Sequence, residues 1–409
     1  MVKDLLRLLK KTNDEDQTAE EIISNDKIVD STQKQHITKN VKAFYKNVNN
    51  ALALGISKVN INRTFSEIDN KQKMVELFRR LNDGGTVLSP FDLVASKLKG
   101  YSWEMEGFLI EILQEYKSIG LTQDNLLKLI FLLEDNYNKE MVNIDATDAE
   151  FAICNKDKIK ITLKALKDFL SHSKLYEYYE NKNRSFIPLF FIAYHIFHRG
   201  LDNNSINSYF NNAETGNSDF NLMRKWFFNS LTNGVFKSKG AGWIPYKTGI
   251  KKLLEVIKQY HKKDFPTKEL FDIYYNHPII FTQDYKLENI NQMDHSFLFY
   301  LMYDLSFIKR TNDIDHVMPK TLLENNYLPE EFNNIKNYQL LDFGTNRGEK
   351  NGKAFREWVN NPEYVNDKNY YITTHLIPED ENMWDESSFK SFSEKRGELI
   401  LEKIKKYNT

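Results

Sequence analysis

The chain has 409 residues, of which 41% are hydrophobic and 28% charged, a balance typical of a soluble globular protein with two or three domains rather than of a disordered chain. Its formal net charge of −1 excludes a globally basic nucleic-acid binder, so any such surface must be local. The single cysteine, Cys154, excludes a disulfide framework and a cysteine-rich zinc site, and is consistent with a reducing, cytoplasmic compartment.

The chain up to about residue 285 is predicted to be helical, because apolar residues recur three and four apart, as in 37–48 and 126–133. Residues 1–11 fit the start of an amphipathic helix that charged residues interrupt, so no signal-peptide core is expected. The most apolar run, Phe186–Phe197, is too short to span a bilayer and contains Pro188. We therefore predict a buried helix there and no membrane segment.

A sharp turn is predicted within Leu77–Leu93, because the two glycines of Asn82–Gly85 permit a positive φ. Ser89 can cap the following helix and Pro90 suits its first position, so we interpret this segment as a helix–turn–helix joint. Further loops are predicted at 202–205, 211–218 and 237–242.

His195 and His198 lie three residues apart in the apolar run. Metal binding by this pair is one interpretation, and packing inside the helical core is the favoured one. The many aromatic residues, such as Trp226, Phe227 and Phe228, are interpreted as helix–helix contacts rather than as base-stacking groups.

The sequence pattern changes after about residue 285. A predicted helix at 296–305 leads into an extended segment that ends at Val317, and Pro319 favours a loop after it. A second apolar, extended segment at 338–343 precedes a glycine-containing turn. A helix is then predicted from near Asn346 to about Val359.

Three side chains in this region have the chemistry that phosphodiester hydrolysis needs. His316 can supply a neutral imidazole that strips a proton from water. A hard cation must neutralise the charge that develops on the phosphate, and Mg²⁺ keeps several waters and takes one or two protein oxygens. Asp315 and Asn346 are a sufficient pair of such ligands, although an asparagine at a helix start can also be a cap.

Three motifs here resemble, in order and spacing, the ββα-metal fold of HNH nucleases. They are the Asp-His-hydrophobic-x-Pro segment at 315–319, Asn337 before a short apolar strand, and Asn346-Arg347-Gly348 with a lysine close behind. Residues 290–409 resemble more closely the C-terminal nuclease domain of the GmrSD family of modification-dependent (type IV) restriction enzymes. That domain typically ends in a helix with phenylalanine and arginine, to which 389–401 is similar.

The resemblance implies a role for each matching residue. His316 is implied as the general base, Asp315 and Asn346 as ligands of Mg²⁺ or Mn²⁺, and Asn337 as the catalytic-site residue that holds the hairpin so that the histidine is aimed. Contacts to DNA phosphates are implied, more weakly, for Arg347, Lys350 and Lys353. The implied mechanism is in-line attack of water beside a single divalent cation. Basic and acidic residues nearly balance at 309–356, so DNA affinity is expected to need the other domain or a partner.

Leu77–Leu93 resembles an element of the N-terminal domain of the same family, which gives Asn82 or Arg79 an alternative role at a nucleotide or phosphate. The family's ParB-like portion, with its Asp-Gly-Gln-Gln-Arg motif, is absent from this sequence. We therefore expect a truncated or split form of the architecture, without NTP-dependent activity by this chain alone. If such activity occurs, a partner chain is expected to supply the missing portion.

The predicted fold is mainly α: a large helical module at 1–285, then a small α+β HNH-type (ββα-metal) domain at 286–409. The predicted function is metal-dependent hydrolysis of DNA in phage defence, against foreign or modified DNA. Two alternatives stay open. One is a non-catalytic, helical DNA-binding or scaffold subunit of a defence complex, and the other is an HNH nuclease that acts on RNA or as a nickase.

Overall fold

The computed structural model describes residues 8, 11–12, 14–25, 30–52, 90–102, 104–139, 143–180, 184–211, 218–236, 246–273, 285–303, 312–342 and 344–408. The chain divides into two compact units, Met1–Leu77 and Phe78–Thr409. Over these described ranges the protein is mainly α-helical, as predicted, with one two-stranded sheet. No helix in them combines the length and apolar character that crossing a membrane requires.

The first unit contains a pair of helices, α2 (Glu15–Asn25) and α3 (Ser31–Leu52), which pack against each other. Asp30 and Gln33 cap α3 reciprocally: the Asp30 carboxylate accepts from the Gln33 amide at 2.8 Å, and the Gln33 side chain accepts from the Asp30 amide at 3.1 Å. Ala19 and Val41 are buried between the helices.

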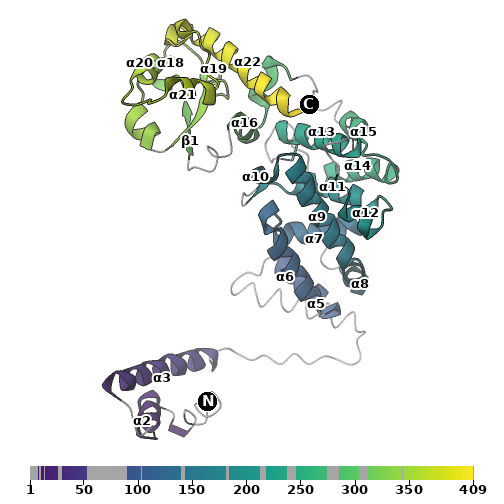
Figure 1. The fold of residues 1–409 in the computed structure, drawn as a ribbon. Coiled ribbons are helices and arrows are strands. Elements are labelled where there is room, and N and C mark those ends of the chain that lie inside the picture. Colours follow the sequence, from purple (N-terminus) through teal and green to yellow (C-terminus); the bar gives the residue numbers. More distant parts are fainter. Residues whose placement is uncertain are drawn as a thin grey trace. The chain divides into compact units, whose positions relative to one another are not determined.

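The described part of the second unit opens with a series of helices (Figure 1) and includes the 3₁₀ turn η1. Their bounds are α5 (Pro90–Tyr101), α6 (Glu104–Tyr116), η1 (Lys117–Ile119), α7 (Gln123–Leu133), α8 (Ala146–Cys154), α9 (Lys156–His172), α10 (Tyr176–Tyr179), α11 (Ile187–His198), α12 (Asn203–Asn207), α13 (Ser218–Thr232), α14 (Tyr246–Gln259) and α15 (Thr267–Asp272). The loop prediction at 202–205 is wrong, because Asp202 caps α12 by accepting from the Ser205 amide at 2.8 Å. The loops predicted at Asn82–Gly85 and 237–242, and most of 211–218, lie outside the described residues.

These helices enclose the larger of two hydrophobic cores. The apolar run forms α11, buried from Pro188 to Phe197 as predicted. Phe169 packs edge-on against Phe220 and Phe227, with ring centroids 5.7 and 5.4 Å apart. The aromatic residues therefore contribute helix–helix packing, as their number indicated.

The remaining elements are η4 (Leu287–Gln292), α16 (His295–Met302), β1 (Asn312–His316), α18 (Lys320–Leu323), α19 (Pro329–Phe332), β2 (Tyr338–Asp342), η5 (Thr345–Lys350), α20 (Phe355–Asn360), α21 (Lys368–Thr374), η6 (Glu381–Met383), η7 (Glu386–Ser388) and α22 (Phe389–Asn408). The segment 286–303, predicted as part of the C-terminal domain, contributes Phe297 and Leu301 to the larger core. A second, smaller core lies at 317–392, around Phe355, Trp358 and Trp384.

Helix α22 belongs to both cores. Phe389 and Phe392 lie in the smaller core, whereas Ile400 and Ile404 lie in the larger one. Figure 1 shows α22, in yellow, running from the lobe that holds β1 toward α16 and α13. The guanidinium of Arg224 on α13 donates to the carbonyl of Tyr407 at 2.6 Å, which ties the end of α22 to the helical part.

The two strands pair antiparallel, with Asp315 opposite Gln339 and His316 opposite Tyr338. Both predicted extended segments are therefore strands, and η5 follows the second. The prediction of one helix to Val359 is wrong, because Asn351 and Gly352 adopt φ values of +29° and +80° and separate η5 from α20.

Candidate functional site

Asn337 fixes the segment that follows β1. Its side chain is fully buried, and its Oδ1 accepts a hydrogen bond from the amide of Met318 at 2.9 Å. Its Nδ2 donates to the carbonyls of Met318 at 3.0 Å and Phe332 at 3.2 Å. The amide of Val317 also donates to the Asn337 carbonyl at 2.7 Å. Asn337 thus gives hydrogen-bond partners to the amides of Val317 and Met318 and to the carbonyl of Met318, just after the end of β1. These bonds hold the loop after His316 in place.

His316 is the last residue of β1, half-buried, with its ring centroid 5.1 Å from that of Tyr338. Its Nε2 lies 2.8 Å from Oδ1 of Asn333. An amide oxygen can only accept, so with the amide in this orientation Nε2 carries the hydrogen and Nδ1 keeps a lone pair. Burial lowers the pKa of His316, although the Asn333 bond and the charge of Asp315 oppose that effect. The imidazole is therefore neutral at pH 7 and can accept a proton at Nδ1.

Asp315 is oriented by its own sheet. Its Oδ2 accepts from the side-chain amide of its strand partner Gln339 at 2.8 Å and from the Lys350 ammonium. The Gln339 amide oxygen in turn accepts from the Tyr371 hydroxyl. The Asp315 side chain is 16% exposed, and no residue in the described ranges hydrogen-bonds to its Oδ1. One carboxylate oxygen therefore stays available to a ligand.

The position of Lys350 differs from the one that a contact to a DNA phosphate would need. Its side chain is only 2% exposed, and its ammonium donates to Asp315 and to the carbonyl of His316. Burial lowers the pKa of Lys350, and the Asp315 carboxylate acts in the opposite direction. The expected phosphate contact is therefore not available in this conformation, because the ammonium is committed to the end of β1.

Asn346 lies near the start of η5, a π-helix in which the Asn351 amide donates to the Asn346 carbonyl at 3.2 Å. Gly344 occupies the cap position, and the half-buried Asn346 side chain hydrogen-bonds to nothing in the described part of the chain. Lys353 donates to the Glu349 carbonyl and stands 4.7 Å from the centroid of the Tyr364 ring. The side chain of Arg347 lies outside the described residues.

The two residues that the resemblance implies as metal ligands, Asp315 and Asn346, carry oxygens of the kind that a hard divalent cation binds. Asp315 offers one uncommitted carboxylate oxygen and Asn346 one uncommitted amide oxygen, and Mg²⁺ or Mn²⁺ takes such oxygens with waters completing the shell. Over the described ranges, no three His, Cys, Asp or Glu side chains form a group that could hold a metal.

Arg396 on α22 holds the start of β2 through hydrogen bonds to backbone carbonyls, a role that the sequence did not reveal. Its fully buried guanidinium donates to the carbonyls of Lys336 and Tyr338, both at 2.8 Å, and of His375 at 3.1 Å. Burial lowers the pKa of Arg396. The acceptors are backbone carbonyls, so the residue fixes where β2 begins relative to the end of α21. The only sequence signal was the arginine within the C-terminal helix.

Tyr303, at the end of α16, connects the larger core to the hairpin. Its hydroxyl accepts from the amide of Leu340 at 3.1 Å and lies 2.9 Å from Nδ1 of His375. Burial lowers the pKa of His375 well below its ordinary value, so this histidine is neutral. No pattern in the sequence pointed to either residue, because their partners are more than thirty positions away along the chain.

The other residues singled out from the sequence lie apart from the hairpin. His195 is buried, with Nε2 3.2 Å from Asp219, and His198 lies 2.9 Å from the carbonyl of Leu133. Both histidines are thus packed inside the helical part, which agrees with the favoured interpretation. In Leu77–Leu93, residues 77–89 lie outside the described ranges, and the rest opens α5.

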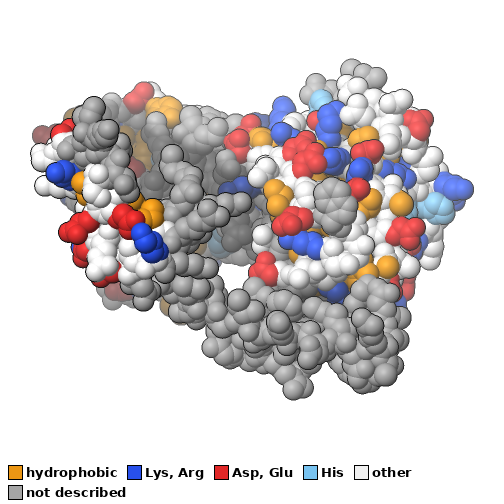
Figure 2. Space-filling model, turned by 90° about the horizontal axis from the view of Figure 1, so that it is seen from below, with side chains coloured by type: hydrophobic (Ala, Val, Ile, Leu, Met, Phe, Trp, Pro, Cys, Tyr) orange, Lys and Arg blue, Asp and Glu red, His pale blue; other side chains and the backbone are white. Residues whose placement is uncertain are grey.

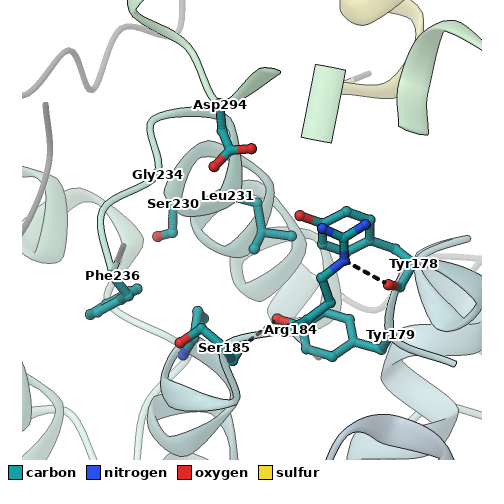
Figure 3. A pocket seen from close by; sticks show the side chains of 10 residues that line it. Tyr178, Tyr179, Arg184, Ser185, Ser230, Leu231, Gly234, Phe236 and Asp294 are labelled. Carbon is teal, nitrogen blue, oxygen red and sulfur yellow. Dashed lines mark hydrogen bonds between the residues drawn. The ribbon is translucent and has the colours of Figure 1, made fainter. Parts of the chain in front are cut away.

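A cavity of about 370 Å³ opens in the helical part, between the start of α11 and the end of α13 (Figure 3). Arg184 lies 4.2 Å from the centroid of the Tyr178 ring on one side, and Asp294 and Ser230 line another. Its lining residues include no histidine or cysteine, so they supply neither a neutral-pH base nor a thiol nucleophile.

On the face shown in Figure 2, Lys and Arg are interspersed with Asp and Glu over the coloured surface, without a large patch of one sign. This agrees with the overall charge of −1. No protein-family model matches the chain, and no curated protein matches it.

Proposed function

We propose that the chain is a metal-dependent endonuclease that hydrolyses phosphodiester bonds in DNA, with its site at the end of β1. The observation that carries the proposal is the arrangement around His316. Its half-buried imidazole is neutral, its Nδ1 has no hydrogen-bond partner among the described residues, and the Asn337 amide holds the loop that follows. Such an imidazole suits a general base at neutral pH.

In the proposed reaction, His316 takes a proton from water at Nδ1 while the water oxygen attacks phosphorus in line. The bond from phosphorus to the leaving oxygen breaks, and that oxygen takes a proton from solvent. A divalent ion held by Asp315 and Asn346 would supply positive charge against the phosphate and the leaving oxygen. Asn337 keeps the imidazole aimed, and Gln339 keeps the carboxylate oriented.

The proposed biological role is defence against foreign DNA, including DNA with modified bases. This part rests on the resemblance of 290–409 to the nuclease domain of modification-dependent restriction enzymes and of Leu77–Leu93 to their N-terminal domain. The formal net charge of −1 favours an additional DNA-binding partner, such as a chain with the ParB-like portion.

The competing proposal is a non-catalytic scaffold subunit. The observation in its favour is that the buried Lys350 ammonium already neutralises Asp315, as in a purely structural ion pair. The two proposals differ in whether a divalent cation binds and whether His316 is needed for cleavage.

The test is incubation of the purified chain with supercoiled plasmid, linear duplex, phage DNA with modified cytosines, and RNA. Each is combined with Mg²⁺ or Mn²⁺, with and without GTP or ATP. His316→Ala is run beside His261→Ala, which removes an exposed histidine from the helical part. We expect DNA cleavage by the wild type and His261→Ala but not by His316→Ala. Equal cleavage by all three proteins would contradict the proposal, and cleavage of RNA alone or nicking alone would favour the corresponding alternative.

A further inference from the structure

Lys350 places a positive charge against one of the proposed metal ligands. Its ammonium donates to Asp315 Oδ2 and to the carbonyl of His316, and its side chain is 2% exposed. A lysine is strongly hydrated in water, so burial at this depth requires the compensation that the carboxylate and the carbonyl provide. The buried ammonium thus has two partners at the end of β1.

Asp315 has a second support that does not depend on the lysine. Gln339 donates to the same oxygen at 2.8 Å, and the Tyr371 hydroxyl holds the far end of the Gln339 amide. If the Lys350 contact were lost, Gln339 would still orient the carboxylate, and no ammonium would balance its negative charge.

The backbone beside Lys350 can accommodate a movement of its side chain. Lys350 is the last residue of the π-helix η5, and Asn351 and Gly352 follow with φ values of +29° and +80°. At such a break we expect the four methylenes of Lys350 to let its ammonium turn toward solvent while β1 and β2 stay paired.

From this geometry we propose that Lys350 is a tethered cation that neutralises Asp315 in the metal-free protein and leaves it when a divalent cation binds. The inference rests on the proposed function, because it assumes the metal ligands named there. The Lys350 ammonium lies on Oδ2, so a divalent ion bound at Oδ1 would add a charge of +2 to the same carboxylate, and the two cations would repel each other in this half-buried site. Metal entry and exposure of Lys350 are therefore one coupled event, and the released ammonium becomes available to a phosphate.

The experiment measures the accessibility of Lys350 in the full chain by reaction with an amine-selective acylating reagent and peptide mass spectrometry. We expect Lys350 to be protected without metal and to react at least tenfold faster with saturating Mn²⁺. Lys390 and Lys395, which lie exposed on α22, are internal standards whose reactivity stays constant. This measurement uses wild-type protein and does not depend on cleavage or on the folding of a variant.

A second measurement titrates Mn²⁺ by electron paramagnetic resonance of the free ion. We expect Lys350→Met to bind Mn²⁺ at least tenfold more tightly than the wild type, Asp315→Asn to lose binding, and the matched variant Lys390→Met to change affinity less than twofold. If the wild type binds Mn²⁺ while Lys350 stays protected and Lys350→Met binds no more tightly, the inference is overturned and the metal site stands. If neither protein binds Mn²⁺, the metal site and the inference are both overturned.

Discussion

At the scale of single residues, the Asn337 side chain ties the loop after His316 to the start of β2 through both backbone groups of Met318. Replacement by alanine leaves the amide and carbonyl of Met318 without partners in a buried position. An unsatisfied buried group costs about 1–3 kcal/mol, so we expect Asn337→Ala to lose roughly 2–4 kcal/mol of unfolding free energy in urea. Asn326→Ala, an exposed change in the same lobe, should stay within about 0.5 kcal/mol.

A second residue-scale prediction concerns pH. The pKa of His316 in the folded chain lies below its ordinary value of 6.5, because burial disfavours the imidazolium. The neutral base then predominates at pH 7, and we expect the rate of DNA cleavage to fall when the pH drops below 6.5. The linked stability has the same sign: the unfolded chain binds the proton more readily, so stability falls as pH falls below 6.5. A cleavage midpoint above pH 6.5 at saturating metal would contradict the assignment.

The candidate site residues were found from a motif in the sequence, whereas the burial of Lys350 was missed because it depends on a backbone feature that the sequence pattern does not show. Asp315, His316 and Asn337 stand in a recognisable spacing, and the strand register puts the first two opposite Gln339 and Tyr338. The burial of Lys350 depends on the break at Asn351 and Gly352, which helical periodicity over 346–359 does not reveal. The roles of Asp315, His316 and Asn337 in hydrolysis stay a prediction.

At the scale of elements, α22 orders the hairpin through Arg396. Arg396→Met keeps the length of the side chain and removes the donors to Lys336, Tyr338 and His375. We expect a loss of about 3–5 kcal/mol in urea unfolding, because one buried and two partly buried carbonyls lose their charged donor. Lys395→Met, one residue earlier and half-exposed, is the control and should change stability by less than about 0.5 kcal/mol. Equal stability of the two variants would show that the guanidinium is dispensable.

The elements themselves were largely predictable because periodicity and strand signals are local. Both strands, the buried apolar helix and the C-terminal helix agree with the expectations, whereas α12 was missed because Asp202 initiates a helix in a segment that resembles a loop. Capping by one aspartate outweighed the low helix propensity of the asparagines beside it.

At the scale of the whole molecule, the two cores share α22. Ile404→Ala removes a fully buried side chain from the larger core, far along the helix from Phe392 in the smaller one. We expect a loss of about 2–5 kcal/mol and, because the helix is continuous, faster amide hydrogen exchange at 338–341 as well as in α16. Faster exchange confined to α16 would mean that the cores unfold independently.

The shared helix also limits how this protein can be rearranged by recombination. A gene fragment that encodes only the hairpin and α22 would carry Ile400, Leu401 and Ile404 without the residues that cover them. The chain from which the fragment was taken would expose the part of its larger core that α22 had covered. Both products would have to bury apolar surface against something else or aggregate. Transfer of the hairpin alone between proteins is thus disfavoured. We expect recombination to keep the second unit whole, with sequence variation concentrated in its loops.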